Sequence, residues 1–192
     1  MKNLIKLFTV VLLVSLTSSF AQQKVETFKI TPDGFNGYVV KSFDGKSETE
    51  IYNSIKKWAE YNINNSSESK NSDIVNEYIG YDIIVKNGIV VKQMGTYIKW
   101  DVKFNIKFRI KGDKVRFDVN ITSMKLNNPT RYHKDDFYFK ADVLNWSFFK
   151  NNGKPKKNTK DARDTIEIIA NGLVNGVSDT ILGVIKSDTD WD

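Results

Sequence analysis

The sequence contains no cysteine, one histidine and three prolines among its 192 residues. Without cysteine the chain has no disulfide bond, no thiolate metal ligand and no cysteine nucleophile, so an ordinary hydrophobic core has to stabilise the fold. The single histidine, His133, lies in a polar segment after a proline, where a loop position is a simpler interpretation than a general base. No glycine-rich phosphate-binding loop stands between a strand and a helix. We therefore expect no enzyme, no catalytic residues and no cofactor.

Two groups of carboxylates are candidates for a metal or acid-base site. Asp188, Asp190 and Asp192 alternate as in a calcium loop, but the glycine and the closing glutamate of such a loop are missing. Asp135 and Asp136 are neighbours, and adjacent side chains point apart. Neither group predicts a metal site.

The first 21 residues have the composition of a signal peptide. Lys2 and Lys6 make a basic start, and residues 7–16 are apolar but too few to span a bilayer. Small residues at Ser19 and Ala21 predict cleavage after Ala21. The interpretation is a signal peptide over 1–21 and a single domain over 22–192, exported to the periplasm or the extracellular space, with no transmembrane segment in the mature chain.

Positive charge is the other compositional feature, with a formal net charge of +6. Most of it comes from lysine, and arginine is scarce. An exported protein seldom meets nucleic acid, so we do not expect a nucleic-acid partner despite the basic composition.

A long β-hairpin over residues 97–126 is the strongest structural pattern. Apolar and polar residues alternate from 97 to 111, as in a strand with one dry and one wet face. Gly112 and Asp113 supply a tight turn, and the apolar face continues on the return strand. The pairs predicted across the turn are Ile110 with Val115, Phe108 with Phe117, and Phe104 with Ile121. A slip in the alternation then predicts a β-bulge near Thr122 and Ser123.

Shorter patterns predict the remaining elements. Ser47 and Glu50 form a capping box that starts a helix ending near residue 61. Strands are predicted over 25–30, 38–43, 74–85, 89–94 and 137–143. Turns are predicted at residues 31–34, at Asn87-Gly88 as a hairpin and at Gly95 as a bend. A polar loop is predicted over 62–73 and a mobile lysine-rich loop over 150–160.

A long helix is predicted over residues 160–186. Its apolar stripe recurs every three or four residues and comprises Ala162, Ile166, Ile169, Leu173, Val177, Ile181 and Val184 or Ile185. Four polar residues, Glu167, Asn171, Asn175 and Asp179, are expected to face solvent and argue against a membrane helix. Gly172 and Gly176 each cost helix stability, which suggests close approach to the sheet.

Together these elements predict an α+β domain: a curved antiparallel sheet with an early helix and a long C-terminal helix packed on one face. Residues 38–126 contain the short motifs Tyr38-Val39-Val40, Gly45-Lys46-Ser47, Ile51-Tyr52 and Lys56-Lys57-Trp58, followed by a run of strands. With these motifs the segment resembles a family of exported Bacteroidetes proteins. That family is a domain of unknown function with a TATA-binding-protein-like (TBP-like) fold. The resemblance implies a curved sheet with helices on one face and supplies no catalytic residues.

Two candidate sites follow from the predicted sheet. Trp100, Phe104, Phe108 and Trp146 form either a core or an apolar ligand site between the sheet and the C-terminal helix. The wet face carries Lys99, Lys103, Lys107, Arg109 and Arg116, which are either solvated or face an anionic partner such as a polysaccharide or the bilayer surface. Arg109 directly opposite Arg116 costs stability, which makes an anionic partner worth testing.

These sites lead to three hypotheses for function. The first is a non-enzymatic binding module of the cell envelope that takes a small apolar ligand. The second is a structural or interaction protein that uses the basic sheet face or the 150–160 loop. The third, a hydrolase with an unrecognised site, has the least support.

Overall fold

The computed structural model describes residues 23–63, 72–129, 135–142 and 145–184. The predicted signal peptide, His133 and the aspartates 188, 190 and 192 lie outside the described residues, as does most of the predicted 62–73 loop.

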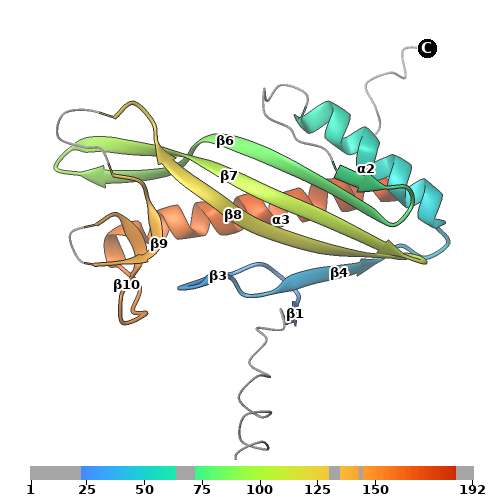
Figure 1. Cartoon of the computed structure of the whole chain (residues 1–192), viewed down its shortest axis with the longest axis horizontal. Helices are drawn as coiled ribbons and strands as arrows, with labels where there is room; N and C mark the ends of the chain where they lie inside the picture. Colours follow the sequence, from blue (N-terminus) through green and yellow to red (C-terminus); the bar gives the residue numbers. More distant parts are fainter. Residues whose placement is uncertain (1–22, 64–71, 130–134, 143–144, 185–192) are drawn as a thin grey trace, which may run out of the picture.

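One sheet and two helices make the two layers of the fold (Figure 1). The six strands have the order β1-β4-β8-β7-β6-β5, and every neighbouring pair is antiparallel except β1 with β4. The strands are β1 Lys24–Val25, β4 Tyr38–Ser42, β5 Ser72–Ile74, β6 Tyr78–Gln93, β7 Thr96–Lys111 and β8 Lys114–Leu126. Helices α2 Glu48–Ile63 and α3 Lys160–Leu182 cover one face, so the predicted α+β architecture is confirmed.

The central hairpin forms with the predicted register. Ile110 pairs with Val115, Phe108 with Phe117, and Phe104 with Ile121. Lys103 then pairs with Ser123, which leaves Thr122 as the extra residue of the predicted bulge.

The predicted hairpin turn at Asn87-Gly88 is wrong, because both residues lie inside the single strand β6. Asn and Gly tolerate a positive φ, and here a β-bulge requires it instead of a turn. Asn87 has φ 53°, and the register of β6 with β7 shifts between Val85 and Ile89. A Cβ on Gly88 would lie 2.9 Å from a methyl carbon of Val102, so only glycine fits without a shift. The actual turn into β7 is at Met94 and Gly95, with φ 46° and 82°.

Short elements depart from the predicted boundaries. The predicted strand 25–30 is split between β1 and β2 Ile30–Thr31, which forms a small hairpin with β3 Gly34–Phe35 around the predicted turn. The predicted strand 74–85 is interrupted by a turn after Ile74, where Asn76 has φ 64°. β9 Tyr138–Ala141 pairs in parallel with β10 Ser147–Lys150, a strand that the sequence analysis did not predict, and the 3-10 helix η1 Lys157–Thr159 leads into α3.

Helix α2 begins with the predicted capping box. The Glu50 N–H donates to Ser47 Oγ at 3.2 Å, and the Ser47 N–H donates to Glu50 Oε2 at 2.8 Å. The buried face of α2 brings Ile51, Ile55 and Trp58 onto the sheet.

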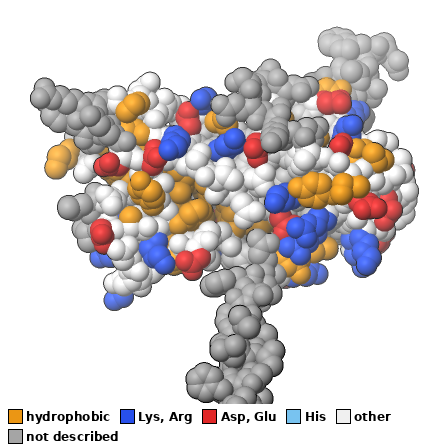
Figure 2. All heavy atoms as spheres, in the orientation of Figure 1, with side chains coloured by type: hydrophobic (Ala, Val, Ile, Leu, Met, Phe, Trp, Pro, Cys, Tyr) orange, Lys and Arg blue, Asp and Glu red, His pale blue; other side chains and the backbone are white. Residues whose placement is uncertain are grey.

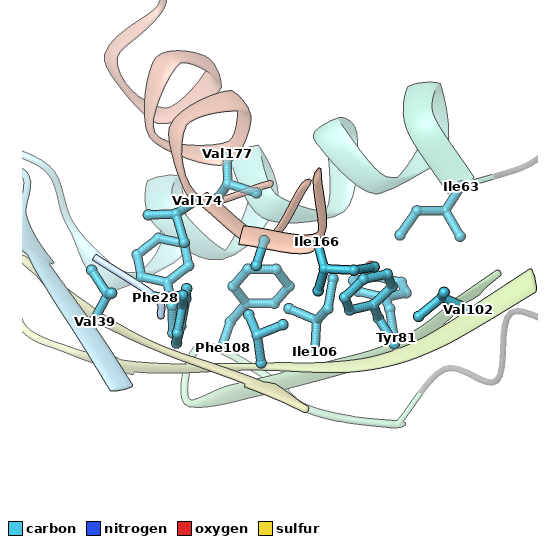
Figure 3. Close-up of a cluster of buried hydrophobic side chains, with 14 of the residues drawn as sticks. Phe28, Val39, Ile63, Tyr81, Val102, Ile106, Phe108, Ile166, Val174 and Val177 are labelled. Atoms are coloured by element: carbon cyan, nitrogen blue, oxygen red, sulfur yellow. The ribbon is translucent and has the colours of Figure 1, made fainter. Parts of the chain in front are cut away.

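The core lies between the helices and the sheet, and Phe108 is at its centre (Figure 3). Its ring centroid lies 5.6 Å from that of Phe117, 6.2 Å from that of Trp58 and 6.3 Å from that of Tyr81. Rings from both layers therefore interlock around one residue of β7.

Helix α3 is present but ends at Leu182, because Gly183 adopts φ 71° and caps it, so Val184 is exposed and does not belong to the stripe. Two predictions about the faces of the helix are also wrong. Ile169 and Leu173 are only partly buried, and Ala170 and Val174 take their place in the buried stripe. Glu167 and Asn171 do not face solvent. Asn171 accepts from the Phe28 N–H at 2.9 Å and donates to the Phe28 carbonyl at 3.0 Å, and Glu167 accepts from the Ile30 N–H at 2.9 Å. The segment before β3 has backbone groups that the sheet leaves unpaired, and α3 satisfies them.

The close approach at Gly176 is made to helix α2 rather than to the strands. A Cβ at Gly176 would lie 3.2 Å from Trp58 Nε1, whereas one at Gly172 meets nothing within 4 Å. Gly172 is exposed, so the prediction of close packing there is wrong.

Replacing Gly176 with leucine should therefore destabilise the protein by about 1–3 kcal/mol, because the new side chain meets Trp58. Gly172→Leu is the matched control and should be neutral or stabilising, since removing a helical glycine recovers about 1 kcal/mol. Urea denaturation of the two variants gives the free energies of unfolding. Equal values would contradict the close packing of the two helices at Gly176.

Candidate functional site

Three of the four aromatic residues predicted to line an apolar site lie in the interior. Trp100 and Phe104 are 0% exposed and Phe108 is 1% exposed. Trp100 donates from Nε1 to the Asp135 carbonyl at 3.1 Å, and its ring contacts those of Phe137 and Trp146 at 5.2 and 5.1 Å. Trp146 is partly exposed. In four hollows of the described surface, only Trp146 of these four side chains belongs to the lining.

The five predicted basic residues lie together on the sheet face away from the helices, which we call the open face. In Figure 1, β7 and β8 pass in front of α3, so Figures 1 and 2 are viewed from this side. Lys99, Lys103, Lys107 and Arg109 lie on the same face of β7, and Arg116 on β8 pairs with Arg109. Figure 2 shows basic and acidic side chains interspersed over this side of the molecule.

Asp118 provides the charge that allows Arg109 and Arg116 to lie opposite each other. Its carboxylate is 3% exposed and accepts from Arg116 Nε at 2.9 Å and Nη2 at 2.5 Å, while Arg109 Nε lies 3.7 Å away. The Arg116 guanidinium also lies 3.7 Å from the centroid of the Tyr38 ring. The like-charge pair therefore has a structural explanation and is not by itself evidence for a ligand.

Two further aspartates reduce the charge of the open face. Asp82 lies 3.5 Å from Lys103 Nζ and accepts from the Asn105 amide at 2.7 Å. Asp101 accepts from Lys86 Nζ at 2.8 Å and from the Asn87 N–H at 2.9 Å. Burial raises the pKa of Asp101, but these two hydrogen bonds outweigh burial and keep its pKa below the usual value. Asp101 is therefore a charged, fixed part of the face.

Basic residues still outnumber acids on the open face, and the helical layer has the opposite balance. Lys99, Lys107 and Lys111 have no carboxylate partner within the described residues. The open face carries Lys86, Lys92, Lys99, Lys103, Lys107, Arg109, Lys111, Lys114, Arg116 and Lys125 against Asp82, Asp101, Asp118 and the Asp136 that pairs with Lys125. Helices α2 and α3 carry Glu48, Glu50, Glu60, Asp161, Asp164, Glu167 and Asp179 against Lys56, Lys57, Lys160 and Arg163. Charge is thus separated across the two layers.

At one end of the basic row, Arg109 and Lys111 line a hollow of about 650 Å³ together with Glu48, Glu77 and Tyr78. Glu48 accepts from the Gly112 N–H at 2.6 Å. Acidic and basic groups are mixed here, so this hollow does not define the charge of a ligand.

The described residues hold no group of three His, Asp or Glu side chains that could bind a metal ion. Within the same residues, no helix has the length and apolar character needed to cross a membrane. Asp135 and Asp136, considered as a carboxylate pair, act separately: the Asp135 carbonyl accepts from Trp100, and Asp136 pairs with Lys125 at 2.6 Å.

The neutralising role of Asp118 was not among the predictions from the sequence. The predicted register already placed Asp118 beside Arg116 on β8 and across from Lys107, so the signal was present in the hairpin. No periodic pattern links Trp146 with the lysine-rich segment, so the sequence did not predict that they lie together.

Solved structures place this fold in the TBP-like class. A TBP-like protein from Parabacteroides distasonis ATCC 8503 superimposes with a TM-score of 0.53 at 14% identity, covering 76% of this chain and 90% of that one. A DUF4468 family protein from Bacteroides ovatus ATCC 8483 superimposes with a TM-score of 0.55 at 14% identity, covering 79% of this chain and 86% of that one. No family model matches the sequence. No curated protein matches it either. The predicted resemblance to Bacteroidetes proteins of unknown function is therefore confirmed for the fold.

Proposed function

We propose that this protein is a non-enzymatic binding module of the cell envelope, and that it binds an extended acidic polysaccharide along the open face of its sheet. The observation that carries the proposal is the separation of charge between a basic open face and an acidic helical layer. The composition of residues 1–21 supports an exported protein, because it predicts a signal peptide.

The shape of the basic row favours a linear partner. Side chains on one face of a strand recur about every 6.6 Å, so Lys99, Lys103, Lys107, Arg109 and Lys111 extend along most of β7. Each exposed ion pair contributes less than about 1 kcal/mol, so binding would need several contacts at once. A polymer with repeated carboxylates meets that requirement, and its binding would weaken as salt rises.

A small apolar ligand between the sheet and α3 has less support. Trp100, Phe104 and Phe108 are enclosed by other rings, as in a filled core, and a ligand there would have to displace them. The open face requires no rearrangement to accept a partner, which favours a binding module that uses the basic sheet face of the second hypothesis in place of the apolar site of the first.

The test uses two variants that lose the same charge from different places. K99Q/K107Q/K111Q removes three unpaired lysines of the open face, and K56Q/K57Q/K160Q removes three lysines of the helical layer. Polygalacturonate binding, measured by biolayer interferometry, should weaken about tenfold in the first variant and much less in the second. Equal weakening would mean that only net charge matters. Binding to phosphatidylglycerol vesicles but not to the polymer would overturn the choice of a polysaccharide.

A further inference from the structure

A hollow of about 570 Å³ lies where Trp146 meets the segment that leads into α3. Gln93 at the end of β6, Asn145 and Lys150 line it together with residues 154–159. Its volume is within the range of small-molecule sites, about 300–1,000 Å³. It is distinct from the open face, because none of the basic residues of β7 and β8 lines it.

Trp146 gives this hollow a rigid aromatic wall. Its ring lies 5.1 Å from that of Trp100, which is completely buried and held by the Asp135 carbonyl. The Trp146 carbonyl accepts from the Tyr138 N–H at 2.9 Å. A partly exposed tryptophan that is already fixed by the core loses little conformational freedom when a ligand packs on it.

The lysine-bearing wall is also fixed, contrary to the predicted mobile loop over 150–160. The Lys156 N–H donates to the Phe148 carbonyl at 2.9 Å, and the Lys150 N–H donates to the Lys154 carbonyl at 2.9 Å. Arg163 on α3 donates from Nη1 to the carbonyls of Phe148 and Lys156 at 3.1 and 2.9 Å. These bonds hold the segment against β10, so the fold sets the backbone positions of its lysines.

Positive charge is concentrated in the hollow. Lys156 donates from Nζ to the carbonyls of Asn145 and Asp142 at 2.7 and 3.1 Å, so its ammonium group is held beside Asn145 in the lining of the hollow. Burial, and then the nearby Lys150 ammonium, lowers the pKa of Lys156. Lys150, Lys154 and Lys157 are exposed and have no carboxylate partner in the described part of the chain. No described aspartate or glutamate belongs to the lining.

We propose that this hollow is a binding site for a single acidic sugar ring, a pyranose that bears a carboxylate or a sulfate. Its negative group would lie among Lys150, Lys154 and Lys157, where charge-assisted hydrogen bonds are stronger than neutral ones. The C–H face of the ring would pack on Trp146, since an indole is a large apolar surface. The amides of Gln93 and Asn145 can both donate to and accept from hydroxyl groups at the ring edge. This site does not depend on the proposed function of the open face.

NMR titration of the full-length protein with galacturonic acid, and with galactose as the neutral match, tests the site. Galacturonic acid should shift the Trp146 indole and the amides of residues 150–158, with galactose at least about tenfold weaker. K150Q/K154Q/K157Q changes only exposed side chains and should lose the acid-specific part, while K99Q/K107Q/K111Q should bind the monosaccharide as the wild type does. W146L, with its fold checked by circular dichroism, should weaken both sugars.

Three results would overturn this proposal. Equal affinity for galactose and galacturonic acid would exclude an acid-selective site. Binding that K150Q/K154Q/K157Q leaves unchanged would place the ligand elsewhere. The same shifts with inorganic phosphate alone, and no effect of W146L, would mean a bare anion site. Loss of polymer binding in K99Q/K107Q/K111Q reports on the open face, and loss of monosaccharide binding in K150Q/K154Q/K157Q reports on the hollow, so the two proposals succeed or fail separately.

Discussion

Replacing Phe108 with alanine should lower the free energy of unfolding by about 3–5 kcal/mol, the usual cost of emptying a large aromatic core site. Phe108 is 1% exposed and contacts rings from α2, β6 and β8. Neighbours on three different elements cannot all move inward to fill the space, so a cavity should remain. A value near the upper end of the range is expected for this reason.

Equilibrium denaturation of Phe108→Ala beside Tyr97→Ala measures this effect. Tyr97 lies on the same strand but is 60% exposed, so its replacement should cost less than about 1 kcal/mol. An unchanged midpoint for Phe108→Ala would mean that its ring borders an open cavity. The apolar ligand site predicted between the sheet and α3 would then regain support.

Deletion of residues 159–192 should leave a protein that is insoluble or fails to unfold cooperatively. Helix α3 buries Ala162, Ile166, Ala170, Val174, Val177 and Ile181 against the rest of the core. Its removal would also leave the backbone groups of Phe28 and Ile30 without Asn171 and Glu167. An exposed apolar sheet face of this size promotes aggregation.

Sedimentation and thermal unfolding of the truncated protein provide the measurement. A synthetic peptide of residues 158–184, added during refolding, should restore solubility if the loss is due to the missing helix. A truncated protein that stays soluble, monomeric and cooperatively folded would show that α3 does not cover the core, and the architecture described here would be wrong.

The sequence by itself determined the central hairpin and the start of α2. Strict alternation over residues 97–111, with a tight turn at Gly112, allows only one register that buries both apolar faces, because a slip of one residue would expose every core side chain. The capping box at Ser47 is equally local, since both partners lie within one turn of helix. Such features depend on neighbours in the chain, and a sequence pattern records them.

Tertiary structure decided what the patterns left open. Asn87-Gly88 favours positive φ, but whether a turn or a bulge uses it depends on the pairing of β6 with β7 on both sides. Polar positions of α3 looked solvent-exposed, yet Asn171 binds Phe28, 143 residues away. Trp146 and the lysines meet only because α3, β10 and the core hold them together. Periodicity reports that a side chain is buried or exposed, but the identity of its partner depends on how distant elements pack.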